Sequence, residues 1–327
     1  MRILVTGCYG FIGFNFIRYV KSFHKNDFEI FGIDNLNNPY SKLNYQNFPL
    51  KNFYSTNINS INKVDIKKVD CIVNFAAESH VDNSINNPNL FIKSNVLGVS
   101  NLIRFAMDKK INNFLHISTD EVYGSLTKGF ATEKSSLNPS SPYSASKAGA
   151  EFIARSFSKT FDFPIKFARP ANNYGPYQQP EKFIPYSIIN LIKNKNIELY
   201  GNGRNIRHWL NVKDTSSAIL KILIDGENNE FYNIGSGDYL TNLQVAKKVT
   251  KVMNLDNSKI EFVKDRPGHD FRYAINFDKL KSLGWKNNCN FEEELERTIA
   301  WYQNNSQWWE KGIKTIYAKR KRRFNLN

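Results

Sequence analysis

The chain has 327 residues, of which 41% are hydrophobic and 14% aromatic, and a formal net charge of +15; this is ample to bury a core in one large domain or two moderate ones. Its three widely separated cysteines exclude a disulfide scaffold or a zinc cluster, and neither a signal peptide nor a membrane span is found, so we expect a soluble, cytoplasmic protein. Because the lysines are scattered over asparagine-rich segments, the charge favours solubility or an anionic small ligand, and we expect no nucleic-acid partner.

Short apolar runs alternate with helical patterns through the first half of the chain. Strands are predicted at residues 3–6, 29–34, 53–57, 71–75, 114–119 and 164–169. Helices are predicted between them at 11–22, 95–110 and 143–161. Several of the strands are apolar throughout, as in sheets covered on both faces, and their alternation with helices indicates βαβ units around a parallel sheet.

The pattern loosens beyond about residue 170, where prolines interrupt it and only a strand at 231–234 and a helix at 242–253 stand out. We therefore predict an α/β fold with a doubly wound parallel sheet and a smaller, mixed α/β substrate lobe. Residues 1–170 would form the nucleotide-binding domain, and later segments of the chain, at about 205–235, would return to that domain. Residues 171–327 would mainly form the substrate lobe and a basic tail, whose run at 319–323 is interpreted as a frayed terminus, with a localisation signal as the alternative.

A glycine-rich segment follows the first predicted strand directly and opens the first helix. Gly7, Gly10 and Gly13 have the spacing GxxGxxG, which allows a tight turn, close approach of backbone N–H groups to a pyrophosphate, and packing of the helix on the sheet. The second strand ends at Asp34, whose carboxylate can bind ribose hydroxyls and repel a 2′-phosphate. Together these features predict NAD rather than NADP; a simple turn cap is the alternative for Asp34.

Residues suited to acid–base chemistry lie at the end of the fifth predicted strand and in the helix at 143–161. Tyr143 and Lys147 share a helix face, so the ammonium group would lower the pKa of the phenol and make it a base toward a substrate hydroxyl. Thr119 adds a hydroxyl group, and Asp120 and Glu121 follow it. Two neighbouring carboxyl groups can be held in opposite protonation states, which suits an acid and a base. A solvated acidic pair is the alternative.

Motifs that run nearly the whole length of the chain carry a family resemblance. They are GCYGFIG (7–13), NFAAESHVDNSI (74–85), HISTDEVYG (116–124), SSPYSASKAGAE (140–151), NNYGPYQQPEKFIP (172–185), WLNVKD (209–214), YNIG (232–235), RPGHDFRY (266–273) and LGW (283–285). Through them the chain resembles the extended short-chain dehydrogenase/reductases and, among these, the nucleotide-sugar 4,6-dehydratases of the UDP-glucose and dTDP-glucose kinds. The resemblance implies a Rossmann domain, a sugar-nucleotide lobe, a tightly held NAD that is recycled in each turnover, and a homodimer formed through four helices.

The enzyme that the resemblance implies is a lyase that removes water from a nucleotide-linked glucose. In the family pattern Tyr143, beside Lys147, takes the proton of the C4 hydroxyl, which Thr119 orients. Glu121 then removes the C5 proton, and Asp120 protonates the departing C6 hydroxyl. Hydride leaves C4 for NAD and returns to C6, which gives a 4-keto-6-deoxy sugar toward rhamnose or another 6-deoxyhexose. No metal is implied.

The resemblance also implies the binding contacts. Cofactor contacts fall on Gly7, Gly10, Phe11, Ile12, Gly13, Asp34, Asn57, Ile58, Ala76, Ala77, Tyr143 and Lys147. Substrate contacts fall on Ser79, His80, Asp82, Asn172, Lys182, Arg207, Asn242, Arg266 and His269. Asn57, His208 and Asn211 depart from the residues usual in relatives. Trp301-Tyr302 and Trp308-Trp309 are more typical of the UDP-glucose enzymes, which favours UDP-glucose over dTDP-glucose, although packing of a terminal helix would also explain them.

Two other functions remain as alternatives. A UDP-hexose 4-epimerase would share the fold, NAD, Tyr143 and Lys147, but its reaction has no elimination and no use for the acid–base pair at 120–121. A non-catalytic family member that senses nucleotides or binds RNA would be expected to lack Tyr143 or Lys147, and both are present.

Overall fold

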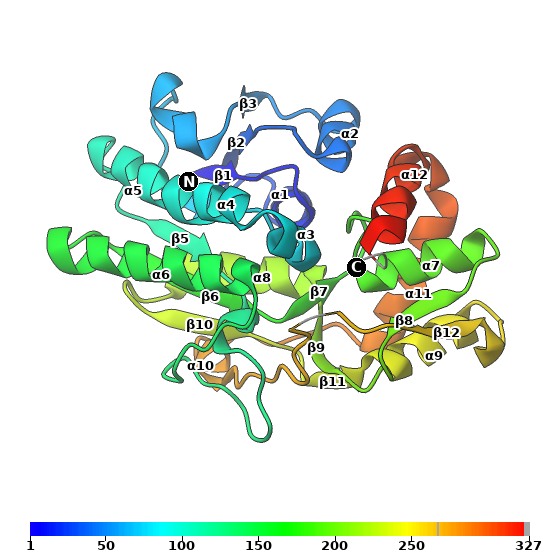
Figure 1. Cartoon of the computed structure of the whole chain (residues 1–327). Coiled ribbons are helices and arrows are strands. Elements are labelled where there is room, and N and C mark those ends of the chain that lie inside the picture. The colour runs from blue at the N-terminus through cyan, green and yellow to red at the C-terminus, as the bar shows by residue number, and fades with distance from the viewer. Residues whose placement is uncertain (267, 324–327) are drawn as a thin grey trace.

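The computed structural model of the protein describes residues 1–266 and 268–323. Its larger part is a seven-stranded parallel sheet in the order β10-β6-β5-β4-β1-β2-β3 (Figure 1). The strands are β1 (Arg2–Thr6), β2 (Glu29–Asp34), β3 (Asn52–Ser55), β4 (Cys71–Asn74), β5 (Phe114–Ile117), β6 (Ile165–Pro170) and β10 (Phe231–Ile234). The central strands β4, β5 and β6 are buried at every residue, because helices cover both faces of the sheet.

Two layers of helices enclose the sheet. α1 (Phe11–Phe23) and α8 (Val212–Asp225) pack together on one face, and α5 (Gly98–Asp108) and α6 (Pro142–Phe161) pack together on the other. Successive side chains of a strand point to opposite faces of the sheet and belong to two different apolar clusters, so that Ile3 lies in one and Leu4 in the other. Short helical segments fill the connections: α2 (Pro39–Asn47), η1 (Ile58–Lys63), α3 (Val81–Asn86), α4 (Pro88–Phe91), η2 (Ile92–Leu97) and η3 (Asp120–Tyr123).

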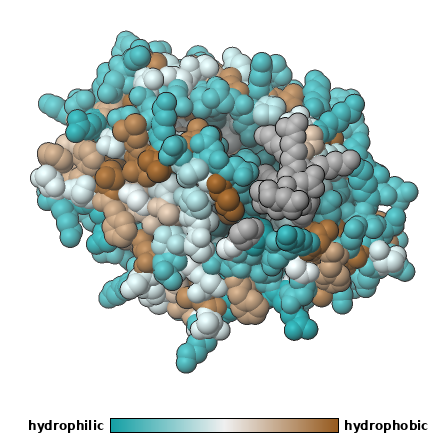
Figure 2. Space-filling view, in the orientation of Figure 1, coloured by the Kyte–Doolittle hydropathy of each residue, from teal (hydrophilic) through white to brown (hydrophobic). Residues whose placement is uncertain are grey.

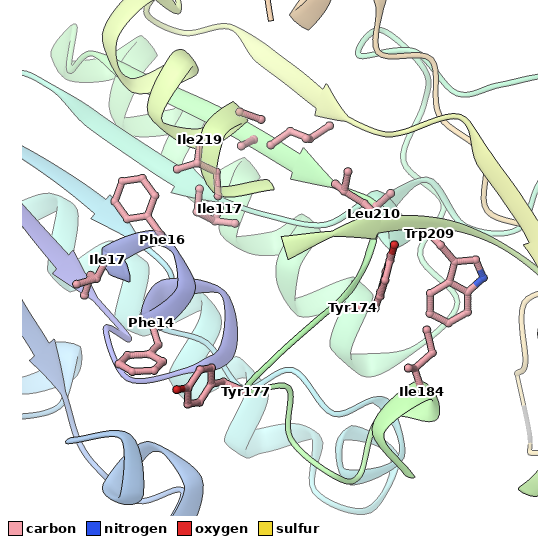
Figure 3. Close-up of a cluster of buried hydrophobic side chains, with 14 of the residues drawn as sticks. Phe14, Phe16, Ile17, Ile117, Tyr174, Tyr177, Ile184, Trp209, Leu210 and Ile219 are labelled. Carbon is pink, nitrogen blue, oxygen red and sulfur yellow. The ribbon is translucent and has the colours of Figure 1, made fainter. Parts of the chain in front are cut away.

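The remainder of the chain builds two small sheets flanked by helices. β7 (Asn172–Tyr174), β9 (Ile206–Asn211) and β11 (Asp238–Thr241) form a mixed sheet, and β8 (Ile197–Tyr200) pairs in parallel with β12 (Ile260–Val263). The other helices are α7 (Phe183–Ile192), α9 (Asn242–Val252), η4 (Asn257–Lys259), α10 (Asp278–Ser282), α11 (Phe291–Asn304) and α12 (Ser306–Arg323). One apolar cluster continues from the large sheet into this part, for example where Phe14 meets Tyr177 at a ring distance of 5.0 Å (Figure 3).

Most predicted elements of the first half are present within one residue of their predicted bounds, and three boundaries need a larger correction. The strand predicted at 53–57 ends at Ser55, because the side chain of Asn57 caps η1. The strand predicted at 114–119 ends at Ile117, because Thr119 caps η3. The helix predicted at 95–110 begins as the π-helical turn η2 and becomes α5 only at Gly98.

The later part of the chain divides between the two regions. α8 and β10 join the large sheet, whereas β9 belongs to the small mixed sheet. The basic run at 319–323, interpreted from sequence as frayed, lies within α12. Among the described residues, no helix combines the length and the apolarity needed to cross a bilayer.

Candidate active site

The predicted site residues gather at the carboxyl ends of β1, β4 and β5. The glycine-rich turn follows β1, the segment with Ala76 and Ala77 follows β4, and η3 follows β5. In an open parallel sheet the carboxyl ends of the strands form the edge at which ligands bind. The sequence motifs therefore converge on one place in the fold.

The glycine-rich turn is packed too tightly for side chains at its first and last glycine. Gly7 has φ +64°, and a Cβ there would lie 2.8 Å from the backbone nitrogen of Ala76. A Cβ on Gly13 would lie 2.5 Å from the carbonyl oxygen of Gly7. The N-cap of α1, Gly10, gives no side-chain hydrogen bond and the first turn holds no acidic residue, so the backbone N–H groups at this helix start suit an anion.

Asp34 lies beside this turn with its carboxylate held by backbone donors. The N–H of Tyr9 donates to Oδ2 at 3.0 Å, and the N–H of Leu36 donates to Oδ1 at 2.9 Å. Burial raises the pKa of Asp34, and these backbone hydrogen bonds oppose the rise. The side-chain oxygen of Asn57, another predicted cofactor contact, accepts the N–H of Asn59 at 2.9 Å.

Two of the predicted cofactor contacts have buried side chains. Ile58 is buried in the apolar cluster with α5, and a Cβ on Gly98 would lie 2.7 Å from its Cδ1. Phe11 is buried in the first turn of α1.

η3 places two carboxyl groups in sequence at the end of β5. The Thr119 hydroxyl accepts the N–H of Glu121 at 3.3 Å and donates to Asp120 Oδ1 at 3.4 Å. Asp120 is 2% exposed, and its Oδ2 has no hydrogen-bond partner among the described residues. Burial raises the pKa of Asp120 well above its usual range, and the charge of Glu121 adds to the rise, while Arg207 opposes it.

Glu121 is partly exposed and lies among cations. Burial raises its pKa, whereas the positive charges of Arg266, Lys182 and Arg207 lower it. Burial raises the pKa of both carboxyl groups, but more strongly at Asp120, and three cations oppose the rise at Glu121 whereas one opposes it at Asp120. This asymmetry is the condition under which one carboxyl stays protonated while its neighbour ionises.

Tyr143 and Lys147 lie on the first turns of α6 against the same strand end. Burial raises the pKa of Tyr143, the charges of Glu121 and Asp120 raise it further, and the Thr119 hydroxyl lowers it. The net shift is opposite in sign to the one expected from the Tyr143–Lys147 spacing. Lys147 does not offset these effects: its ammonium donates to the carbonyl of Ile117 at 2.6 Å, and burial lowers the pKa of this lysine to about 8.

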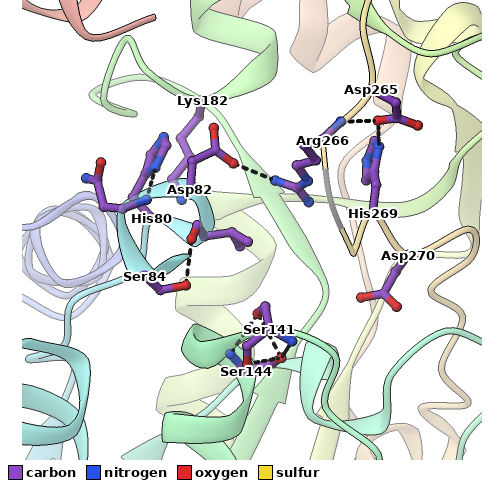
Figure 4. A network of polar contacts seen from close by, with 12 residues as sticks. His80, Asp82, Ser84, Ser141, Ser144, Lys182, Asp265, Arg266, His269 and Asp270 are labelled. Carbon is purple, nitrogen blue, oxygen red and sulfur yellow. Dashed lines mark hydrogen bonds and ion pairs between the residues drawn. The ribbon is translucent and has the colours of Figure 1, made fainter. Parts of the chain in front are cut away.

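Predicted substrate contacts from three segments, Lys182, Asp82 and Arg266, lie near one another (Figure 4). Lys182, at the start of α7, donates to the carbonyl of Ser79 at 2.8 Å. Asp82 on α3 pairs with Arg266 at 3.1 Å, and the Nε of that arginine is buried without a hydrogen-bond partner in the described structure. Basic groups with unused donors suit phosphate oxygens.

The other predicted contacts are placed as follows. Arg207 is buried and donates to the carbonyl of Asp270 at 2.9 Å, and His269 pairs with Asp265 at 2.7 Å. His80 caps α3 by accepting the N–H of Asn83 at 3.4 Å. Asn172 Oδ1 is buried with no partner among the described residues, and Asn242 begins α9, where its N–H donates to the carbonyl of Asn205.

Sequence reasoning missed two buried groups that support the site. Asp270 accepts hydrogen bonds from the hydroxyls of Ser140 and Tyr273, and its charge raises the pKa of Glu121. It lies inside the RPGHDFRY motif, yet nothing in the pattern separated it from its neighbours. Arg169 is buried on β6 and pairs with Glu151 of α6; an arginine near the end of the predicted strand at 164–169 was the available signal.

His208, which departs from the family pattern, is a buried neutral base. Its Nε2 accepts the N–H groups of Ser236 and Gly237, both at 2.8 Å, and burial lowers its pKa to about 3. The unfolded chain binds a proton here below its ordinary pKa of about 6.5, whereas the folded chain does not until about pH 3. The stabilisation is therefore complete above pH 6.5 and is lost as the pH falls.

We expect this one histidine to remove about 2 kcal/mol from the free energy of unfolding between pH 7 and pH 5. His208→Gln keeps a neutral acceptor at the turn but cannot be protonated, so it should lack this part of the pH dependence. Urea unfolding of both proteins at the two pH values measures the difference. Equal losses in the two proteins would contradict the prediction.

Comparison with known proteins gives a consistent set of relatives. A family model described as GDP-mannose 4,6 dehydratase matches residues 4–298. The low-salt glycan biosynthesis protein Agl12 of Haloferax volcanii is 43% identical over 92% of this chain and 98% of that protein. A dTDP-glucose 4,6-dehydratase of Streptomyces niveus is 38% identical over 95% of each. The crystal structure of the dTDP-glucose 4,6-dehydratase DesIV of Streptomyces venezuelae with NAD and TYD bound matches with a TM-score of 0.90 and 39% identity, over 95% of this chain and 99% of that one.

Epimerases share the architecture at lower identity. The UDP-glucose 4-epimerase of Thermotoga maritima matches with a TM-score of 0.85 but 25% identity, over 93% of this chain and 99% of that one. The fold alone therefore does not separate the two reactions. The side chains at the end of β5 must do so.

Proposed function

Because this chain belongs to the nucleotide-sugar 4,6-dehydratases of the extended short-chain dehydrogenase/reductase family, we propose that it dehydrates a nucleotide-linked glucose to the 4-keto-6-deoxy sugar. The substrate proposed first is dTDP-glucose, after the names of its relatives, with UDP-glucose second. The aromatic residues that favoured UDP-glucose have a structural explanation, since Tyr302, Trp308 and Trp309 are buried where α11 and α12 pack.

The residues around the glycine-rich turn fit NAD. The tight turn and the uncapped start of α1 suit the pyrophosphate, and the Asp34 carboxylate suits ribose hydroxyls and disfavours a 2′-phosphate. The backbones of Phe11, Ile12, Ile58, Ala76 and Ala77 would complete its site, together with Asn57, Tyr143 and Lys147. When bound, NAD would accept hydride from C4 of the sugar and return it to C6.

The side chains of η3 and α6 would divide the proton transfers. Tyr143 would accept the proton of the C4 hydroxyl, with the hydroxyl of Thr119 orienting it and the charge of Lys147 one helical turn away. Oxidation at C4 acidifies the C5 proton, which Glu121 would remove, and C5 would be reprotonated when hydride returns to C6. Asp120 would protonate the C6 hydroxyl so that it leaves as water.

One observation carries the proposal over an epimerase: the unequal environments of Asp120 and Glu121. Asp120 is 2% exposed with an unpartnered oxygen, which favours its protonated form. Burial also raises the pKa of Glu121, but less, and the charges of Arg266, Lys182 and Arg207 oppose the rise and favour its ionised form. Elimination needs an acid and a base together, whereas epimerisation at C4 needs neither carboxyl.

A homodimer and a cytoplasmic location complete the proposal. Leu90, Ile92 and Leu97 on α4 and η2, and Phe152 on the neighbouring α6, are each at least 43% exposed. Figure 2 shows apolar side chains gathered on the left of the face in view, where Figure 1 places α4 and α6. An exposed apolar surface on helices suits a self-complementary contact with a second copy. The three unpaired cysteines support a reducing compartment.

The test is to incubate the purified protein separately with dTDP-glucose and UDP-glucose. Formation of a 4-keto-6-deoxy sugar is read from its alkali-generated absorbance, and the two rates rank the nucleotides. A galactose product would favour the epimerase, and no product from either sugar would refute the dehydratase proposal.

A further inference from the structure

A line of buried hydrogen bonds connects the glycine-rich turn with the C-terminal helix. The N–H of Tyr9 donates to Asp34 Oδ2 at 3.0 Å, and the carbonyl of Tyr9 accepts Asn44 Nδ2 at 3.1 Å. The oxygen of the same amide, Asn44 Oδ1, accepts the indole N–H of Trp308 at 2.8 Å. Tyr9, Asn44 and Trp308 are 0%, 1% and 6% exposed, so water does not compete for these groups.

Close packing holds the same junction between α2 and α12. The rings of Tyr40 and Trp308 lie 4.8 Å apart, and the Tyr40 hydroxyl donates to the carbonyl of Trp309 at 3.4 Å. A Cβ on Gly312 would lie 2.4 Å from that hydroxyl oxygen, so α12 needs glycine where it crosses Tyr40. Figure 1 shows α2 and α12 on the same side of the molecule, and the two helices are in contact.

We propose that Trp308 is a positioning residue for NAD, acting through Asn44 on Tyr9 and Asp34. The inference rests on the proposed use of NAD. Because both its Nδ2 and its Oδ1 are hydrogen-bonded, the buried side-chain amide of Asn44 has a single orientation. It therefore fixes α2 relative to the glycine-rich turn. Without the indole N–H, Asn44 Oδ1 is left buried and unpaired, which loosens α2 and the turn. NAD must then order these groups when it binds, and its affinity falls accordingly.

The chain supplies a matched control in the next residue. Trp309 is 1% exposed, and its indole N–H donates to the carbonyl of Tyr302 at 2.8 Å. That contact joins α11 to α12 and does not reach α2. Trp308→Phe and Trp309→Phe therefore each delete one buried indole hydrogen bond from the same helix. Only Trp308→Phe removes a hydrogen bond from the series that leads through Asn44 and Tyr9 to Asp34.

The experiment measures the rate at which bound NAD exchanges with excess labelled NAD in the wild type and in both variants, together with the melting temperature of each. We expect Trp308→Phe to release NAD roughly tenfold faster, an effect the size of one unpaired buried group. Trp309→Phe should release NAD at the wild-type rate despite a similar loss of melting temperature. An unchanged rate in Trp308→Phe, or equal acceleration in both variants, would overturn the inference.

Hydrogen exchange of the wild type gives a second readout that needs no variant. Because coupling between sites is reciprocal, NAD should slow amide exchange in α12 as well as in α2. No NAD-dependent protection of α12 would also overturn the inference. Failure of the wild type to retain NAD would instead contradict the proposed function, so the two failures are distinguishable.

Discussion

Glu121→Gln is expected to slow formation of the 4-keto-6-deoxy sugar by about 10²–10⁴-fold, the usual contribution of a positioned base. Oxidation at C4 should survive, because Thr119, Tyr143 and Lys147 are unchanged. The oxidised sugar should therefore accumulate on the enzyme, and mass spectrometry of the quenched mixture would detect it. The amide has nearly the same shape as the carboxylate, so the change removes the base and little else.

Asp120→Asn is the matched control for this prediction, because it removes the proposed acid from the adjacent position. In heavy water this variant should still exchange the C5 proton for deuterium, since Glu121 is intact, while the C6 hydroxyl stays in place. Glu121→Gln should show no such exchange. Deuterium at C5 in the Glu121→Gln reaction, or rapid product formation by that variant, would refute the assignment of Glu121 as the base.

The two carboxyl groups also show how far the sequence could predict the site. The motifs predicted that Thr119, Asp120 and Glu121 lie near Tyr143, and the structure places them together. The motifs did not reveal that Asp120 is nearly inaccessible while Glu121 lies among three cations. Those charges come from Lys182, Arg207 and Arg266, which the fold brings together from distant segments of the chain.

The local sequence pattern was enough to predict the bounds of an element where local interactions decide its structure. The strand at 231–234 was predicted at its observed bounds, because an apolar run in a buried parallel strand needs no distant partner to be recognised. The start of the helix predicted at 95–110 was wrong, because there contacts with distant residues decide the structure. Asn95 is buried there and bonds the backbone of Glu78 and the hydroxyl of Ser146, contacts that favour the π-helical turn η2.

The C-terminal helices were not predicted from the sequence, because their apolar residues are spaced among charged ones, mainly glutamates in α11 and lysines and arginines in α12. Only the packing of Trp301, Tyr302 and Trp308 against Tyr177 and Tyr40 shows which face is buried. Such contacts join residues more than a hundred positions apart. Composition predicted a basic tail, and tertiary contacts place the preceding Trp308, Trp309, Ile313 and Ile316 in the core.

Arg169→Met is expected to lower the free energy of unfolding by about 3–5 kcal/mol, because it strands a buried carboxylate. Arg169 pairs with Glu151 through two hydrogen bonds of 2.9 and 2.5 Å, and their side chains are 3% and 1% exposed. The same guanidinium donates to the hydroxyl of Tyr123 at 2.7 Å. It therefore ties η3, which carries Asp120 and Glu121, to α6, which carries Tyr143.

Two further variants decide whether the loss comes from the stranded charge. Arg169→Met combined with Glu151→Leu should recover part of the stability, because no unpaired ion remains. Lys221→Met, which breaks an exposed ion pair with Asp225 of similar length (2.7 Å), should change it by less than about 1 kcal/mol. Urea unfolding measures all three. If the double variant is as unstable as Arg169→Met, the stranded charge is not the cause, and the guanidinium stabilises the fold through Tyr123 and packing.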